Sequence, residues 1–253
     1  WSQADIVGPE GEDWRVPVSE LEARLSLLSD LLAKAGFGGA IIQHPVDLYY
    51  YAGGRQNGSL FVPATATSAT CESGGDGPTF FVRRSLSRAI FEAGGDDAPL
   101  KLCKFPSMNE FAQHLKDMGA EGSIGLQQGE IPASLHKYFN EKLSLFGDCP
   151  DVTSIIHGQR EVKSAWEIEM LEAGADIQLK MFDAVTEVGG EGITELELVA
   201  AAEAVSRAEG YGGSVQMRRF PMQCDRGVII AGRAGGIPSF FDSALGGVGA
   251  HPL

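Results

Sequence analysis

Short strand-like segments alternate with helix-like segments between residues 18 and 153, and this alternation constrains the fold more than any other feature of the sequence. The runs expected to be strands are short, apolar and bounded by turn residues; they are 39–43, 59–63, 79–83, 100–104 and 123–126. The runs expected to be helices are 19–35, 85–93, 109–118 and 133–143. Alternation of this kind predicts an α/β domain with a mixed or parallel sheet.

Three local signals refine this prediction. Ser19 followed by Glu22 is a capping-box pattern that predicts the start of the first helix. His44 to Asp47 is expected to form a turn after the first strand, and the Gly-, Ser- and Thr-rich stretch 64–78 is expected to form a long hairpin loop.

The pattern changes in the last hundred residues. Apolar residues on one stripe predict a long helix over 161–188, and Thr194 with Glu197 is a second capping box, opening a helix that runs to about Ala208. Strands are expected at 217–220 and 227–232. Two helices and two strands without a third layer make an incomplete domain.

The charge balance excludes some classes of partner. Lys and Arg number 20 against 34 Asp and Glu, a formal net charge of -14. A polyanion is repelled by such a chain, so neither nucleic acid nor an anionic membrane is expected as a partner. No apolar run approaches the roughly 20 residues of a membrane-spanning helix. The four cysteines form no C-x-x-C pair, so reduced thiols in a cytoplasmic protein are expected.

No recognisable catalytic motif is assembled in the chain, and neither a catalytic residue nor a metal ligand is predicted from it. The five histidines are dispersed; His44 could face a cleft, although a turn position explains it more simply. Arg218, beside Phe220, leaves two interpretations open. It could be a salt-bridged strand residue, or it could anchor the carboxylate of an anionic substrate, because the guanidinium fork matches carboxylate geometry.

The order of several motifs resembles the creatinase, prolidase and aminopeptidase P family from about residue 18 onward. Gly39–Ile42 and Asp47–Gly53 resemble the start of that family's N-terminal domain. Arg160-Glu-Val-Lys-Ser-Ala-Trp-Glu-Ile168 is similar to the family's Arg-x-x-Lys-Ser-x-x-Glu-Ile entry into the catalytic domain. Gly192-Ile-Thr-Glu-Leu-Glu197 is similar to its Gly-x-Thr-Glu-x-Glu helix start.

The resemblance implies an architecture and an activity. It implies an RNase H-like α/β N-terminal domain at 18–156 and a partial α+β "pita-bread" domain at 157–253, which follow an extended lead-in that the Gly and Pro residues of 1–17 predict. Members of the family hold two divalent metal ions, such as Mn, Co or Zn, on two Asp, one His and two Glu. The metals activate a water that hydrolyses a peptide or related C–N bond, often one before proline.

Two departures limit what carries over. The family's first metal-binding Asp follows the point matched by the end of this chain, so all five ligands are expected beyond Leu253 and the chain as given is expected to be inactive. Relatives also place a substrate-binding His after the Gly that corresponds to Gly232, where this sequence has Ser239 or Phe240. Together with Arg218, these are the candidate substrate-binding residues, and the change weighs against cleavage of a prolyl peptide.

Two functions therefore stay open. The first is a metal-dependent hydrolase of the Xaa-Pro peptidase or creatinase type, acting on a peptide or small-molecule substrate. The second is a non-catalytic relative that serves as a binding or dimerisation scaffold. The resemblance also implies a homodimer.

Overall fold

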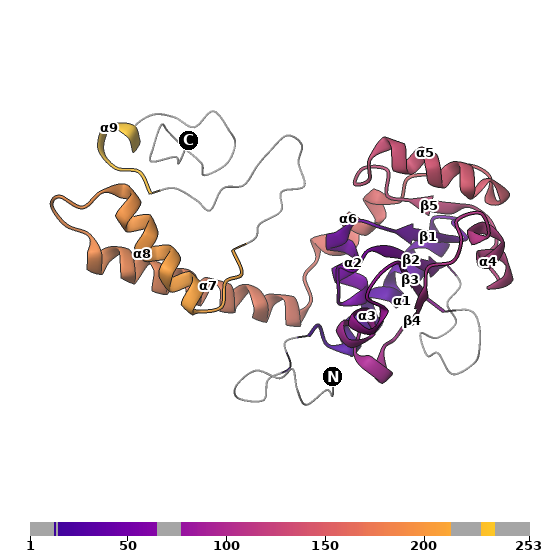
Figure 1. The fold of residues 1–253 in the computed structure, drawn as a ribbon, viewed down its shortest axis with the longest axis horizontal. Coiled ribbons are helices and arrows are strands. Elements are labelled where there is room, and N and C mark those ends of the chain that lie inside the picture. The colour runs from indigo at the N-terminus through magenta and orange to yellow at the C-terminus, as the bar shows by residue number, and fades with distance from the viewer. Residues whose placement is uncertain (1–12, 14, 65–76, 214–228, 236–253) are drawn as a thin grey trace. The chain divides into compact units, whose positions relative to one another are not determined.

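The computed structural model describes residues 13, 15–64, 77–213 and 229–235, and the chain divides into two compact units, Trp1–Val162 and Lys163–Leu253. The first unit is built on a five-stranded sheet in the order β4-β3-β2-β1-β5 (Figure 1). The strands are β1 (Gly39–Ile42), β2 (Gly58–Pro63), β3 (Thr79–Val82), β4 (Lys101–Lys104) and β5 (Ile124–Leu126). All five expected strands are therefore confirmed.

The sheet is mixed, as predicted. β1 pairs with β2 and β2 with β3 in antiparallel fashion, whereas β1 pairs with β5 and β3 with β4 in parallel. Parallel neighbours need a crossover connection, and helices supply it. As a result, the carboxyl ends of β1 and β5 meet at one edge of the sheet.

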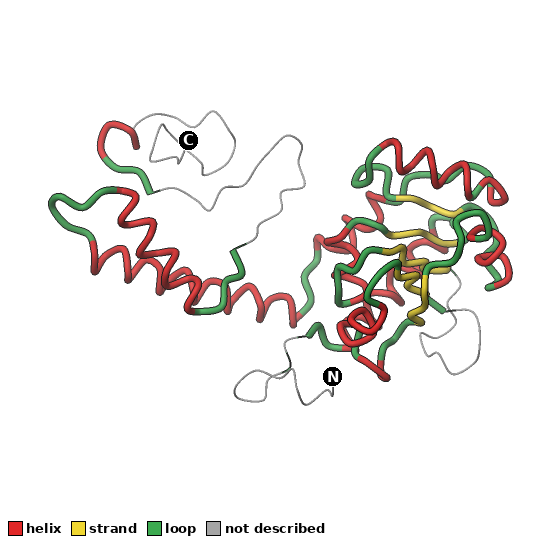
Figure 2. Tube along the Cα trace, in the orientation of Figure 1, coloured by secondary structure: helices red, strands yellow, loops and turns green. Residues whose placement is uncertain are grey.

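Helices cover both faces of the sheet (Figure 2). They are α1 (Val18–Lys34), α2 (Pro45–Ala52), α3 (Leu86–Glu92), α4 (Phe111–Asp117), α5 (Ala133–Lys142) and α6 (Thr153–Glu161), with short 3₁₀ turns η2 (Gly95–Asp97) and η3 (Ser144–Phe146). Ala40 and Ile42 of β1 pack with α1, α2, α3 and α6, whereas Ile41 packs with α4 and α5. Because successive strand side chains alternate between faces, the apolar run of β1 fills both cores of this three-layer unit.

Two predictions at the start of the chain are wrong. Helix α1 begins at Val18 with Pro17 as its N-cap, so Ser19 lies inside the first turn and makes no capping hydrogen bond. His44 to Asp47 is not a turn, because His44 is the N-cap of α2 and Pro45 occupies its first position. Proline is suited to that position, since its fixed φ fits the helix and its missing N–H would have no helical partner.

The junction also differs from the prediction. The chain from Thr153 to Glu161 forms α6, which was not expected, and it packs against α1. The first unit therefore extends to Val162, and the expected boundary after residue 156 falls inside α6. The long helix α7 (Ala165–Val188) begins at Ala165 rather than at 161.

The second unit contains α7 and α8 (Glu195–Ala208), which pack against each other. Both helices start with a full capping box, formed by Ser164 with Glu167 and by Thr194 with Glu197. The predicted box at Thr194 is thus confirmed. None of the helices in the described residues combines the length and apolar character needed to cross a bilayer.

Two strands were predicted later in this unit, and the structure describes part of one of them. Residues 217–220 lie outside the described residues. Of 227–232, the described part is not a strand: residues 229–231 lack regular structure and a short helix, α9 (Gly232–Gly235), follows. The amide of Ala231 donates to Glu195 Oε1 at 2.7 Å, so the carboxylate takes the donor that a strand would use in its ladder.

Candidate functional site

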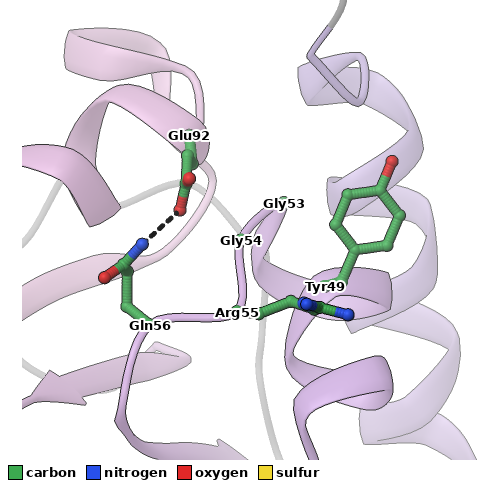
Figure 3. Close-up of a pocket in the computed structure, with 6 residues that line it drawn as sticks. All are labelled: Tyr49, Gly53, Gly54, Arg55, Gln56 and Glu92. Atoms are coloured by element: carbon green, nitrogen blue, oxygen red, sulfur yellow. Dashed lines mark hydrogen bonds between the residues drawn. The ribbon is translucent and has the colours of Figure 1, made fainter. Parts of the chain in front are cut away.

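A surface pocket of the first unit lies at the carboxyl end of α2, beside α3. It encloses about 520 Å³. Its lining consists of Tyr49, Gly53, Gly54, Arg55, Gln56 and Glu92 (Figure 3). Tyr49 and Arg55 lie on one side of the Gly53–Gly54 turn, and Gln56 and Glu92 lie on the other.

Two glycines form the floor of this pocket because the backbone of α2 runs close to Glu92. Gly53 ends α2 in the left-handed region at φ +71, which favours glycine. A Cβ on Gly53 would lie 2.4 Å from the backbone oxygen of Glu92. A Cβ on Gly54 would lie 2.0 Å from Glu92 Oε2, so it would displace the Glu92 side chain, whereas a Cβ on Gly53 would press against the α3 backbone.

The charges around the pocket are unequally paired. The Glu92 carboxylate contacts Arg88 Nε at 2.6 Å through one oxygen and accepts from Gln56 Nε2 at 3.2 Å through the other. Arg55 is exposed and makes neither an ion pair nor a hydrogen bond to any residue in the described ranges. The pocket therefore has one guanidinium whose charge the described residues leave unbalanced.

A smaller hollow of about 210 Å³ adjoins the pocket and shares Tyr49, Gly53 and Glu92 with it. Arg15 reaches this hollow, where Nη1 donates to the backbone oxygen of Phe91 at 3.1 Å and the guanidinium lies 4.7 Å from the centre of the Phe91 ring. Since Arg15 also forms an ion pair with Asp13, its charge is already balanced.

A buried ionic cluster occupies the other end of α2. Asp47 is fully buried and accepts hydrogen bonds from Arg160 Nη1 at 2.7 Å and from Gln127 Nε2 at 2.7 Å. His44 Nδ1 lies 3.2 Å from the same carboxylate. Gln127 Oε1 in turn accepts from the backbone amides of Gln43 and His44. The cluster thereby ties α2 to α6 and to the ends of β1 and β5.

Opposing effects act on the pKa of Asp47. Burial acts to raise it, whereas the hydrogen bond with His44, the charge of Arg160 and the amide of Gln127 lower it. Together these partners outweigh burial, so the pKa of Asp47 lies below its ordinary value and the side chain is a carboxylate at neutral pH.

The cluster continues to a second carboxylate. Glu130 lies 2.8 Å from His157 Nε2 and 3.8 Å from His44 Nε2. Within the described ranges, however, no group of three or more His, Cys, Asp or Glu side chains is arranged to hold a metal ion. The described residues therefore do not fit the pair of divalent ions that the resemblance implies.

The three residues predicted to bind substrate, Arg218, Ser239 and Phe240, lie outside the described residues. The structure instead brings together residues that sequence reasoning did not connect. One sequence signal could have connected His44 with Gln127. Gln127 directly follows β5 and His44 follows β1, and parallel neighbouring strands end at the same edge of a sheet.

Comparison with known proteins identifies one matching domain family and a related sequence. The model of the creatinase/prolidase N-terminal domain matches residues 24–162. An Xaa-Pro dipeptidase from Pyrococcus furiosus is 24% identical over 190 residues, which cover 75% of this chain and 49% of the relative. The chain thus spans about half the length of the curated relative it matches.

Solved structures share the fold. A dipeptidase, PepE, from Mycobacterium ulcerans superposes with a TM-score of 0.60 at 21% identity, covering 78% of this chain and 52% of the other. An Xaa-Pro dipeptidase from Bacillus anthracis gives a TM-score of 0.61 at 18% identity, covering 75% and 50%. A prolidase from Pyrococcus horikoshii gives 0.56 at 20% identity, covering 74% and 49%.

Proposed function

Because the chain belongs to the family defined by the creatinase/prolidase N-terminal domain, we propose that it is the N-terminal part of a metal-dependent hydrolase of the Xaa-Pro peptidase or creatinase type. Such an enzyme cleaves a peptide or related C–N bond. In this proposal the first unit is the N-terminal domain, and the helices α7 and α8 begin the catalytic domain.

The reach of the sequence similarity supports this proposal. The 190 residues aligned with the Xaa-Pro dipeptidase of Pyrococcus furiosus outnumber those of the first unit, which ends at Val162. The likeness must therefore continue into the second unit. The capping boxes at Ser164 and Thr194 lie there, and both belong to motifs that resemble the family's catalytic domain.

The metal site is proposed to lie beyond the residues described. A two-metal hydrolase needs several Asp, Glu and His side chains that converge from different strands, and the described residues contain no such group. The relatives are about twice as long as the stretch they share with this chain, which leaves room for the ligands in the remainder of a catalytic domain. When bound, the metals would supply an activated water.

Substrate, assembly and location are part of the same proposal. We propose a short peptide or small molecule as substrate, a homodimer as the assembly and the cytoplasm as the location. A homodimer gives one species of twice the chain mass in light scattering at several concentrations. A constant monomer mass for the protein made from the complete reading frame contradicts this part.

A hydrolysis assay tests the activity. The 253-residue chain and the protein from the complete reading frame are each incubated with Mn²⁺ and two substrates, an Xaa-Pro dipeptide and a dipeptide without proline, with a chelator as control. We expect turnover only from the longer protein and only without chelator. Turnover by the 253-residue chain would contradict the placement of the metal ligands.

The same assay also tests the alternative function, a non-catalytic scaffold. A longer protein that carries the Asp, Asp, His, Glu and Glu ligands and hydrolyses either dipeptide excludes that function. A longer protein that lacks them and binds no metal excludes the metal-dependent hydrolase and leaves the scaffold as the remaining candidate.

A further inference from the structure

We propose that the edge of β4 that no described strand covers binds an extended acidic segment of another protein, which adds to the sheet as a further strand. The first unit alone carries this inference, which does not depend on hydrolysis by the protein. Its basis is the open side of the strand, the cations beside it and the repulsion that two such edges would meet.

The open backbone of β4 is the first argument. β4 is the last strand at its end of the described sheet, where it pairs with β3 (Figure 1). The amides of Lys101 and Phe105 donate to backbone oxygens on the β3 side. Because the direction of the backbone N–H alternates along a strand, the amides of Leu102 and Lys104 point away from the sheet. An extended peptide can pair with such groups by strand addition.

Four cations beside this edge are the second argument. Lys101 and Lys104 belong to β4, and Arg83 and Arg84 follow β3 at the end where Lys104 lies. All four are exposed, and none of them forms an ion pair with any residue that the structure describes. The guanidinium of Arg83 lies 3.9 Å from the centre of the Phe105 ring, a contact that leaves its charge unneutralised. The edge therefore favours an anionic partner.

The local charge differs from the charge of the whole chain. Residues 79–108 hold five Lys and Arg against three Asp and Glu, whereas the chain as a whole carries -14. At physiological salt, interactions between exposed charges are largely screened beyond about 8 Å. A short segment bound at the edge therefore responds to the nearby cations more than to the distant acidic residues.

The same lysines argue against a second copy of this chain as the partner. If two β4 edges paired antiparallel over all four residues, Lys101 of one copy would face Lys104 of the other. Like charges directly opposite each other destabilise a strand pair, and lysines on an edge strand commonly prevent pairing between copies. An acidic strand replaces this repulsion with attraction.

The positions of the two lysines set the pattern of acidic residues in the partner. Successive side chains of a strand point to opposite faces, and Leu102 packs against one core whereas Cys103 packs against the other. Lys101 and Lys104 are three positions apart, so they lie on opposite faces. Two acidic residues three positions apart in an extended segment can therefore each lie beside one lysine.

Titration of the 253-residue chain with a peptide tests the inference. The probe, acetyl-Thr-Glu-Val-Thr-Glu-Thr-amide, has two Glu three positions apart. One control peptide has Gln in place of both Glu. A second control keeps both Glu and carries N-methyl groups on two adjacent backbone amides, one for each edge of the peptide, so that strand pairing is blocked while the charge is kept.

We expect the probe to bind with saturation and to shift the amides of residues 101–105. Hydrogen exchange at the amides of Leu102 and Lys104 should slow when the probe is bound, because these amides then donate to the added strand. Each control peptide should bind at least fivefold more weakly than the probe.

Two variants complete the test. Lys104→Glu should weaken binding of the probe about tenfold, since an attraction becomes a repulsion. Lys137→Glu makes the same change of charge at an exposed position of α5 and should leave binding unchanged. The amide spectrum of each variant reports whether the fold is retained.

Several outcomes overturn the inference. No binding of the probe, or equal binding of the probe and its Gln counterpart, removes the acidic partner. Equal binding of the N-methylated peptide, or unchanged exchange at Leu102 and Lys104, excludes strand addition. Equal binding by the parent chain and Lys104→Glu places the peptide elsewhere. Failure of the proposed hydrolysis is a separate result, because none of these titrations requires turnover.

Discussion

Asp47 Oδ1 lies 2.7 Å from Arg160 Nη1, an ion pair that joins the first turn of α2 to the last turn of α6. The two residues belong to two motifs that are separate in the sequence, one opening with Asp47 and the other with Arg160. Their contact brings the motifs together at the end of the first unit. The side chain of Arg160 thereby anchors the helix that precedes the second unit.

Replacing Asp47 should destabilise the first unit. In Asp47→Asn the buried side chain loses its charge, and Arg160, 30% exposed, loses its ion pair with Asp47. We expect a loss of about 2–3 kcal/mol in the free energy of unfolding, measured by urea denaturation. Asp117→Asn, which alters an exposed carboxylate bonded to Gln113, is the control and should change it by less than about 0.5 kcal/mol. Equal losses in the two variants would show that the buried pair has no special role.

The same pair predicts a dependence on pH. The pKa of Asp47 is lower in the folded chain than its ordinary value of about 3.9. Between the two values the unfolded state binds more protons, so stability rises with pH there and is lost as the pH falls through the folded pKa. The melting temperature of the parent chain should therefore fall more steeply below about pH 4.5 than that of Asp47→Asn. Parallel curves would contradict this.

The glycine at the end of α2 should resist substitution more than a comparable glycine elsewhere. Gly53 and Gly36 both have positive φ, at +71 and +80, but only Gly53 has a close neighbour; a Cβ on Gly36 meets nothing within 4 Å. Gly36→Ala should cost about 1 kcal/mol from backbone strain, and Gly53→Ala about 2 kcal/mol more. Urea denaturation measures both. Equal costs would mean that the approach of Glu92 to Gly53 is not tight.

The capping box of α8 should contribute measurable stability to the second unit. Thr194 Oγ1 accepts from the amide of Glu197, so Thr194→Ala should cost about 1 kcal/mol. Thr186→Ala is the matched control, because the Thr186 hydroxyl bonds the backbone oxygen of Phe182 within α7 and caps no helix. Hydrogen exchange in the first turn of α8 should accelerate in the first variant alone. Acceleration in both would argue against the cap.

Much of the fold could be predicted from the sequence, since the strands are short buried runs with clear boundaries. β1 and β3 are buried throughout, and such runs differ visibly from the amphipathic helices around them. The helix α2 was missed because its Leu48–Tyr51 run is too short to show helical periodicity, and His44-Pro45 is typical of a turn as well as of a helix start.

The pocket and the ionic cluster could not be predicted from local sequence patterns, because their residues lie far apart in the sequence. Glu92 meets Gly54 only through the packing of α3 on α2, and Arg160 meets Asp47 across 113 positions. No spacing rule links residues so far apart. The neighbour that makes Gly53 and Gly54 necessary, Glu92, is a property of the tertiary structure.

Metal binding and hydrolysis by the protein from the complete reading frame test the central claim most directly. The protein is freed of metal, titrated with Mn²⁺ and assayed at each addition on dipeptides with and without a prolyl bond. The account predicts two bound ions per chain and activity that rises with their binding. A protein that binds no Mn²⁺ and leaves both dipeptides intact would contradict it.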